Sequence, residues 1–317
     1  MKCAVLGGTG FIGSHLINAL IAQGHEVSSL TRHVPPQNTI LSDEAMAQVR
    51  WHMGDYENRE DVKETLEGAD ICFHLISSSL PGNSNKDPSW DISTNVCNSL
   101  QVMELAVSLG LKGLYFVSSG GTIYGDAQVL PIPEEHPLEP TCSYGVSKLA
   151  IEKYLALFER LHRLPYKIIR LANPYGPGQD VNKAQGAVSV FIERSRNLLP
   201  IEIWGDGSNV RDYIYIDDAI RGIIALMGYE GKERIFNLGS GQGRSLLEVI
   251  AEISKWVDPM PDVKFLPARE FDLKANVLDI SKARTCFGFE PIVAFDDGIR
   301  RTLEWQNSKN LVKVVNK

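Results

Sequence analysis

The feature that most limits the possible folds is a glycine-rich turn near the N-terminus, set between a short apolar run and an amphipathic segment. Lys2 to Leu6 has strand character, the turn reads Gly7-Gly-Thr-Gly-Phe-Ile-Gly13, and residues 14–22 space their apolar side chains as a helix does. Three glycines in this context permit a tight turn, a close approach of backbone to a diphosphate, and close packing of helix on strand. The helix N-terminus then faces the anion. The turn therefore predicts a dinucleotide-binding loop, with contacts from Gly7, Gly10, Phe11, Ile12 and Gly13.

Strand-like and helical segments alternate after this turn. Apolar runs typical of strands occur at Glu26 to Leu30, Val49 to Met53, Ile71 to Leu75 and Gly113 to Ser118, with helical patterns near Arg59 to Glu67 and Ser93 to Leu109. Such alternation predicts an α/β fold with a doubly wound parallel sheet and right-handed crossovers. The length of 317 residues suits about two domains, or one large α/β unit with an appended part. We expect Asp55, after the third strand, to lie near the adenine, and Leu75, after the fourth, to line the cofactor.

Composition limits the class of partner. The net charge of -7 and the lack of Lys or Arg runs argue against a nucleic-acid surface. No apolar run approaches the roughly 20 residues that cross a bilayer, and Met1 leads straight into a strand pattern, so we expect a cytoplasmic protein without a membrane partner. The five cysteines are scattered and lack C-x-x-C spacing, which predicts reduced thiols. No metal site is expected.

The end of the second predicted strand bears on the choice between NAD and NADP. NAD-binding loops commonly place an acidic residue here for the ribose, whereas an arginine accommodates a 2′-phosphate. This chain has Thr31 and Arg32 at that point and no acid. The local chemistry favours NADP slightly over NAD, unless Arg32 is a solvated surface residue and other contacts hold NAD.

A tyrosine and a lysine four residues apart begin a later helical pattern, Tyr144-Gly-Val-Ser-Lys148. In a helix this spacing puts both side chains on one face, with Cβ atoms roughly 6 Å apart. A nearby ammonium favours the ionised phenol, so the tyrosine, which ordinarily titrates near about pH 10, becomes a usable base for a sugar or alcohol hydroxyl. The same spacing arises by chance in many chains, so its weight depends on the other motifs.

Five ordered motifs point to one family. They are the glycine turn, Tyr144-Gly-Val-Ser-Lys148, Asn173-Pro-Tyr-Gly-Pro177, Gly205-Asp-Gly-Ser-Asn-Val-Arg-Asp-Tyr-Ile-Tyr-Ile-Asp-Asp218 and Pro267-Ala-Arg269. Together they resemble the extended short-chain dehydrogenase/reductases, specifically the NAD(P)-dependent nucleotide-sugar epimerase/dehydratase group. The resemblance implies a Rossmann-type sheet with a smaller C-terminal substrate domain. We expect residues 1–172 to form the first, with 212–240 returning to it, and residues 173–211 and 241–317 to form the second.

The resemblance also implies roles for individual residues. Tyr144 would remove the sugar hydroxyl proton, and Lys148 would bind the nicotinamide ribose and lower the tyrosine pKa. Asn173, Arg211 and Arg269 would contact the diphosphate or nucleoside of a nucleotide sugar, since guanidinium groups bind phosphate oxygens in a forked geometry. The alternative for each arginine is an ordinary surface ion pair.

Two departures from the family pattern matter. One is Thr31-Arg32, which replaces the acid common in NAD-bound epimerases and gives a reductase more weight, and the other is the turn after Ser118. The position that usually carries a hydrogen-bonding Ser or Thr is Gly120, so the hydroxyl role passes to Ser119, to Thr122 or to a water molecule. The Asp-Glu pair of the dehydratases is replaced by Gly121-Thr122, which argues against loss of water. The favoured function is therefore epimerisation, at C4.

Two other functions and one assembly are also compatible with the sequence. An NADPH-dependent reductase of a 4-keto nucleotide sugar would use Tyr144 as an acid, and a non-catalytic dinucleotide sensor would use neither Tyr144 nor Lys148 for chemistry. The family commonly pairs two long helices per subunit, so Ser93 to Leu109 and Tyr144 to Leu161 are candidates for a homodimer contact.

Overall fold

The structure is a computed structural model that describes residues 1–33, 40–182, 186–269 and 272–315, with residues from 309 onward as helical backbone only. Its larger part is built on a sheet of seven parallel strands in the order β10-β6-β5-β4-β1-β2-β3. The strands are β1 (Lys2–Leu6), β2 (Glu26–Thr31), β3 (Arg50–Met53), β4 (Ile71–His74), β5 (Gly113–Ser119), β6 (Tyr166–Leu171) and β10 (Ile235–Leu238). The predicted doubly wound α/β sheet of the Rossmann type is confirmed.

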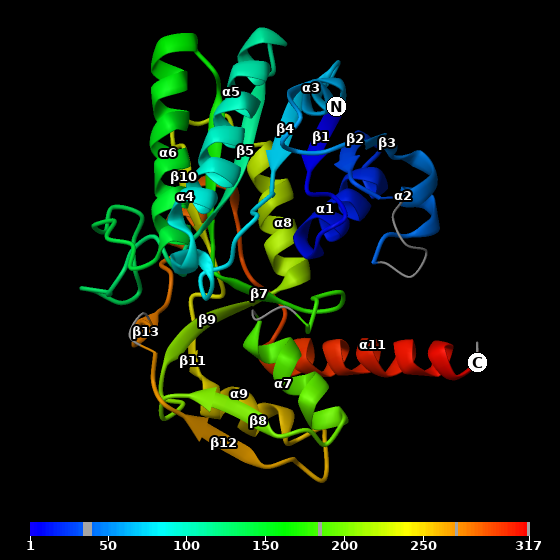
Figure 1. Cartoon of the computed structure of the whole chain (residues 1–317), viewed down its shortest axis with the longest axis vertical. Helices are drawn as coiled ribbons and strands as arrows, with labels where there is room; N and C mark the ends of the chain where they lie inside the picture. Colours follow the sequence, from blue (N-terminus) through cyan, green and yellow to red (C-terminus); the bar gives the residue numbers. More distant parts are fainter. Residues whose placement is uncertain (34–39, 183–185, 270–271, 316–317) are drawn as a thin grey trace.

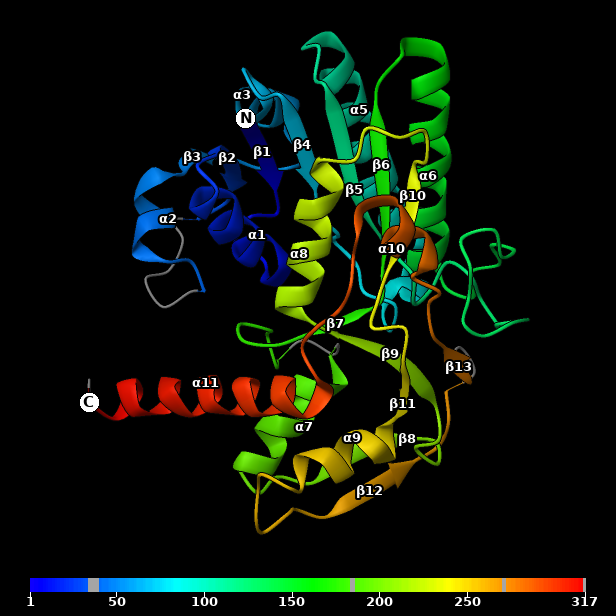
Figure 2. The same ribbon diagram turned by 180° about the vertical axis from the view of Figure 1, so that it is seen from behind.

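Helices cover both faces of this sheet. One face carries α3 (Arg59–Leu66), α5 (Asn98–Ser108) and α6 (Ser143–His162), which share an apolar core with the strands (Figure 1). The other face carries α1 (Phe11–Ala22), α2 (Asp43–Gln48), α8 (Ile216–Met227) and α10 (Ser281–Phe287), and Figure 2 shows α1 and α8 in front of the strands. Strands β4 and β6 are buried along their whole length, which explains their uninterrupted apolar runs.

The helix predicted for Ser93 to Leu109 differs from the structure. The helical path starts earlier, as α4 (Pro88–Asp91), continues through a π-helical segment (Ile92–Cys97) and ends as α5. It starts early because Asp87 accepts a hydrogen bond from the Trp90 amide at 2.9 Å, and a proline follows at the first helical position. The stretch before the predicted helix therefore already contains helical turns, at Ser84–Lys86 and at Pro88–Asp91.

The smaller part lies below the large sheet in Figure 1. Strand β9 (Val210–Tyr215) is its centre and pairs with β7 (Asn173–Tyr175), β11 (Gly243–Ser245) and β13 (Ala275–Asn276), while β8 (Ile201–Trp204) pairs with β12 (Val263–Leu266). Helices α7 (Ala187–Arg196), α9 (Leu246–Ile253) and α11 (Phe295–Val315) pack around these strands.

The returning segment predicted for residues 212–240 divides between the two parts. Strand β9 lies in the small sheet, whereas α8 packs against α1 and β10 pairs with β6 in the large one. Within the described ranges, no helix combines the length and the apolar character needed to cross a membrane.

Candidate active site

Tyr144 and Lys148 lie in the first two turns of α6, beside the carboxyl end of β5. The Lys148 ammonium donates a hydrogen bond to the Val117 carbonyl at 3.0 Å and lies 4.6 Å from the centre of the Phe116 ring. It is 5.6 Å from the centre of the Tyr144 ring. The Tyr144 phenol is within hydrogen-bonding reach of the Ser119 hydroxyl. The structure thus brings together three of the predicted residues, Ser119, Tyr144 and Lys148.

The pKa values of this pair differ from the expectation drawn from spacing alone. Burial raises the pKa of Tyr144 to about 12, against smaller lowering effects of hydrogen bonds with Ser119 and Ser77. Burial lowers the pKa of Lys148 to about 8, while the carboxylates of Glu152 and Asp91 act in the opposite direction. The predicted lowering of the tyrosine pKa by the lysine is wrong for these side chains, because the ammonium is directed at the Val117 carbonyl and burial dominates. The described residues therefore keep the phenol protonated at neutral pH.

The two hydroxyls proposed as substitutes for the missing family serine are placed differently. The Ser119 side chain lowers the pKa of Tyr144 and so lies near its phenol, whereas the Thr122 hydroxyl is buried and finds no hydrogen-bond partner among the described residues. A Cβ atom on Gly121 would lie 3.9 Å from the Ser119 hydroxyl oxygen and 3.7 Å from the Asn173 side-chain oxygen. Ser119 and Asn173 thus face the same small space, which favours Ser119 for the hydroxyl role.

Packing explains why residue 120 is a glycine. A Cβ atom there would lie 2.5 Å from Cδ1 of Leu278, a side chain that is fully buried, and 3.1 Å from the Arg170 carbonyl oxygen. Asn276, two residues before Leu278, donates to the Gly120 carbonyl at 3.0 Å. The C-terminal part of the chain therefore occupies the space that a serine side chain would need.

The glycine turn fits a dinucleotide diphosphate. Gly7 has a φ of +96°, and a Cβ atom on Gly13 would lie 2.1 Å from the Gly7 carbonyl oxygen, so α1 packs against the turn without room for a side chain. The N-cap residue of α1 is Gly10, which has no side chain to cap the amides of the first helical turn. Those amides, from Phe11, Ile12 and Gly13, can therefore bind an anion. A Cβ atom on Gly7 would lie 3.4 Å from the backbone carbonyl carbon of Leu75, so Leu75 lies beside the turn.

The remaining predicted cofactor residues lie at the ends of β2 and β3. The Gly54 amide donates to the Thr31 carbonyl at 3.0 Å, so these ends are adjacent. The Thr31 hydroxyl donates to the His33 carbonyl at 2.6 Å and is buried, so it serves its own turn. Asp55 is exposed and accepts a hydrogen bond from the Glu57 amide at 3.0 Å. Arg32 is exposed beside them.

The three residues expected to bind substrate come from separate segments of the smaller part. The Asn173 side chain donates to the Asp212 carbonyl at 2.9 Å, which places it next to Arg211 on β9. Burial lowers the pKa of Arg211, and the neighbouring Arg269 guanidinium lowers it further, so the two cations share one region. Arg269 pairs with Asp272 at 3.0 Å.

Sequence reasoning missed Trp204. Its ring lies 5.2 Å from the Arg269 guanidinium, and 41% of the residue is exposed. The signal was present in β8, where Ile201 and Ile203 are buried and the alternate positions face solvent, so an aromatic residue at an outward position was unusual. An exposed aromatic ring beside the Arg269 guanidinium suits a planar base next to a diphosphate.

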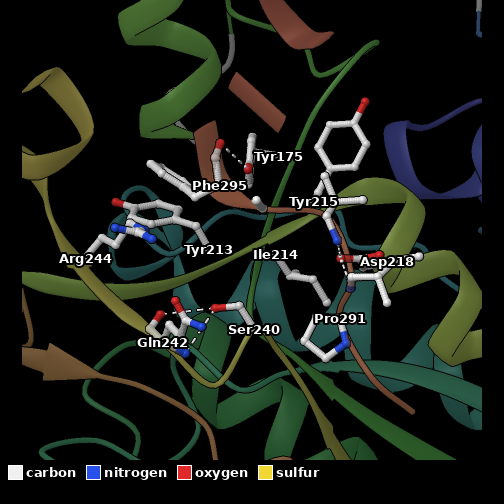
Figure 3. A pocket seen from close by; sticks show the side chains of 13 residues that line it. Tyr175, Tyr213, Ile214, Tyr215, Asp218, Ser240, Gln242, Arg244, Pro291 and Phe295 are labelled. Carbon is white, nitrogen blue, oxygen red and sulfur yellow. Dashed lines mark hydrogen bonds between the residues drawn. The ribbon is translucent and has the colours of Figure 1, made fainter. Parts of the chain in front are cut away.

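A separate pocket, of about 160 Å³, lies between β9, β11 and the segment before α11 (Figure 3). Tyr175, Tyr213 and Tyr215 line it, and the Arg244 guanidinium lies 4.6 Å from the Phe295 ring. Among the described residues, its lining includes none of those predicted to act on cofactor or substrate. The pocket is therefore distinct from the cluster at Tyr144.

Comparison with known proteins identifies the family of the chain. The model of the NAD dependent epimerase/dehydratase family matches residues 3–239. The UDP-glucose 4-epimerase of Mycolicibacterium smegmatis is 32% identical over 322 residues, covering 98% of this chain and 100% of the relative. The dTDP-4-dehydro-6-deoxyglucose reductase of Escherichia coli is 30% identical over 312 residues, covering 95% and 96%. The crystal structure of Thermotoga maritima UDP-glucose 4-epimerase with UDP-glucose has a TM-score of 0.90 at 32% identity, covering 98% and 100%. The chain belongs to the NAD dependent epimerase/dehydratase family and is an enzyme.

Proposed function

We propose that the protein is a nucleotide-diphosphate-sugar epimerase that acts at C4 of a UDP-sugar. The observation that carries this proposal is the cluster of Ser119, Tyr144 and Lys148 at the carboxyl end of β5. The cluster has the residue types of a hydroxyl-oxidising site, and the chain belongs to the NAD dependent epimerase/dehydratase family. UDP as the nucleotide is supported by the similarity to the Thermotoga maritima epimerase, whose structure contains UDP-glucose.

The cofactor implied by the family is NAD, which, when bound, accepts a hydride from a sugar carbon and returns it. The glycine turn would hold its diphosphate through the first amides of α1, and Lys148 would hold the nicotinamide ribose. Arg32 is exposed at the end of β2, where a 2′-phosphate would lie. We therefore expect NADP to be accepted as well, and an Arg32→Ala variant to lose NADP affinity while keeping that for NAD. Equal losses for both, in a binding titration, would remove this role of Arg32.

Different side chains of this protein transfer the proton and position the substrate. Tyr144 would act as the phenolate, which the positive charge of a bound oxidised nicotinamide would favour over the phenol that the protein alone keeps protonated. It takes the proton of the C4 hydroxyl as that carbon is oxidised, and returns it after the sugar has turned over. Ser119 donates a hydrogen bond to the phenolate, and Lys148 would hold the nicotinamide ribose beside it. Arg211 and Arg269 hold the diphosphate, so the sugar is free to present either face.

The direct test is interconversion of UDP-glucose and UDP-galactose by the purified protein without added cofactor. We expect both directions to proceed, and Tyr144→Phe to lower kcat by about 10²–10⁴-fold, the usual contribution of a general base. Tyr154→Phe is the matched control, because Tyr154 lies on the same helix with 38% of its surface exposed. Full activity in Tyr144→Phe, or no epimer from UDP-, dTDP- or GDP-sugars, would sink the proposal.

A second function is favoured by the similarity to the Escherichia coli reductase and by Arg32. An NADPH-dependent reductase would use Tyr144 as the acid that protonates the new hydroxyl. Stoichiometric loss of NADPH absorbance with a 4-keto nucleotide sugar, together with no epimer from the parent sugar, would identify this activity.

The outer face of α6 supports a homodimer, which we propose as the assembly. Tyr154, Leu157 and Leu161 are 38%, 41% and 61% exposed and follow one another at helical spacing. Such a stripe on an otherwise packed helix is best covered by an equivalent stripe of a second copy.

A further inference from the structure

The N-terminus of α6, which carries Tyr144, is capped by a distant part of the chain. Its N-cap residue, Cys142, makes no capping hydrogen bond with its side chain. Instead, the Ser143 amide donates to the Asn85 side-chain oxygen at 2.8 Å, and the Ser143 hydroxyl donates to Oδ2 of Asp91 at 2.9 Å. The Ser147 hydroxyl donates to the same Asp91 oxygen at 2.5 Å. The first two turns of the helix are therefore held from outside it.

Asp91 is fully buried at the end of α4, where the π-helical segment begins. Its other oxygen, Oδ1, accepts hydrogen bonds from the Ser79 hydroxyl and, at 3.0 Å, from the Asn95 side-chain amide. Asn95 in turn accepts from the Ser78 amide at 2.8 Å. One carboxylate thus joins α6, the π-helical segment and the loop after β4. Its negative charge also suits the N-terminus of α6, where the helix dipole is positive.

The partners of this carboxylate are next to the reacting side chains. Ser143 immediately precedes Tyr144, and Ser147 immediately precedes Lys148. The loop on the other side of the carboxylate contains Ser77, whose side chain lowers the pKa of Tyr144 and so lies near its phenol. A shift of α6 relative to this loop would move the phenol away from both Ser77 and Ser119.

We propose that Asp91 is a positioning residue for the reaction: it sets Tyr144 and Lys148 against Ser119 by tying Ser143 and Ser147 to the loop at Ser79. The proposal rests on the proposed function, because positioning has meaning only for a chemical step. No described contact places Asp91 against the cofactor loop or the arginines of the smaller part.

The charge of Asp91 gives the proposal a signature in pH dependence. The charged and titratable groups that act on Lys148 are Glu152 on its own helix and Asp91, and the lysine in turn affects His74 of β4. Cys142 and Asp91 act on Tyr144. The Asp91 carboxylate raises the pKa of both Lys148 and Tyr144, so its removal lowers both. The pH profile of kcat should then shift to lower pH.

The test is the variant Asp91→Asn, which keeps the volume and removes the charge. We expect kcat to fall by about 10–100-fold, since small displacements of reacting groups have effects of this size. KM for the UDP-sugar should stay within about twofold, because Arg211 and Arg269 are untouched. The matched control is Asp87→Asn, an exposed residue of the same segment whose capping bond to the Trp90 amide an asparagine can keep. It should match the wild type in kcat and pH profile.

Hydrogen exchange of the full-length protein gives a readout that does not depend on turnover. In Asp91→Asn, amides of residues 143–148 should exchange faster, while those of β1 and α8 stay unchanged. Unchanged exchange at 143–148 would overturn the proposal, as would faster exchange with wild-type kcat and pH profile. A uniform rise in exchange with no pH shift would show that Asp91 serves global stability only, and would also overturn it.

Two further variants cover the case in which Asp91→Asn does not fold. Ser143→Ala and Ser147→Ala each remove one of the hydrogen bonds from α6, and both should lower kcat and loosen the first turns without a change in KM. Wild-type kcat in both would overturn the proposal. Failure of the wild-type protein to epimerise any nucleotide sugar would refute the proposed function instead, and the exchange of residues 143–148 would still report whether Asp91 holds the helix.

Discussion

The buried ammonium of Lys148 serves the proposed reaction but lowers the stability of the folded protein. Its pKa falls from the ordinary 10.5 to about 8 in the folded protein, so the unfolded chain binds the proton more tightly. At pH 7 this difference opposes folding by about 3 kcal/mol. We expect Lys148→Met to raise the free energy of unfolding at pH 7 by about 1–3 kcal/mol. This range allows for the hydrogen bond to the Val117 carbonyl, which the methionine cannot make. It should also lower kcat at least about a hundredfold.

The pH dependence of the stability gained in Lys148→Met identifies the cause of that gain. Below pH 8 the folded wild type keeps the proton, so the gain should be constant. Between pH 8 and 10.5 the folded wild type loses the proton first, so the gain should shrink, as measured by urea unfolding. Lys153→Met, on the exposed side of the same helix, should change neither stability nor kcat. A Lys148→Met variant that is less stable at every pH would contradict this account.

Gly120 is the second residue at which packing decides chemistry. A serine there would restore the family hydroxyl, but its Cβ would lie 2.5 Å from Leu278 Cδ1. We expect Gly120→Ser to lower the free energy of unfolding by about 1–3 kcal/mol through overpacking, without a gain in kcat. The double variant Gly120→Ser, Leu278→Ala should be more stable than the sum of the single changes predicts, because the serine occupies space that the leucine has left.

Gly121→Ala is the control for this pair, since a Cβ atom at Gly121 meets its neighbours only at ordinary contact distances of 3.7 Å or more. Its unfolding by urea should match that of the wild type closely. Strictly additive losses in the double variant would show that Leu278 is not the obstacle to a side chain at position 120.

At the scale of elements, helix α6 is anchored to β6 by a buried ion pair behind the catalytic face. Arg170 and Glu152 are 2.7 Å apart, with both side chains 2% exposed, and Arg170 also donates to the Tyr124 hydroxyl at 3.0 Å. We expect Glu152→Gln to cost about 3 kcal/mol or more in unfolding free energy, because it leaves an uncompensated buried charge. Glu159→Gln is the matched control on the same helix: its pair with Arg234 has the same 2.7 Å separation but is about one-third exposed. It should cost less than about 1 kcal/mol in unfolding free energy. Equal costs for the two variants in guanidinium chloride unfolding would refute the difference between the buried and the exposed ion pair.

Local patterns predicted most of these elements because each pattern reports a local requirement. The apolar run of β6 reflects burial on both faces, and the spacing of Tyr144 and Lys148 reflects the period of α6. Asp91 carried no such signal, because its partners come from the loop after β4, from the π-helical segment and from α6. The early start of the helix at Pro88 depended on the cap at Asp87, which resembles an ordinary polar loop in sequence.

The candidate site was predictable only as far as its motifs are local. Ser119, Tyr144 and Lys148 come together because parallel strands end at one edge and α6 begins beside it. The reason for Gly120 was hidden, since it depends on Leu278, far along the chain. The raised pKa of Tyr144 was likewise hidden, because spacing shows which side chains are near but not how deeply they are buried or where the ammonium points.

At the scale of the whole molecule, the exposed stripe on α6 predicts how two copies meet. Val146 lies two turns before Tyr154 and is 47% exposed, so the stripe runs from the first turn of α6 to Leu161 near its end. Pairing of this stripe with its copy would bury apolar surface on the helix that carries Tyr144 and Lys148.

We expect light scattering to give twice the chain mass of 35.1 kDa for the wild type and one chain mass for Leu157→Glu. Leu199→Glu, at a residue 50% exposed after α7, is the control and should remain dimeric. Because α6 is packed within each subunit through Ile151 and Leu155, the monomeric variant should stay folded by circular dichroism. A wild-type protein of one chain mass would exclude the dimer, and a Leu157→Glu protein of two chain masses would place the contact elsewhere.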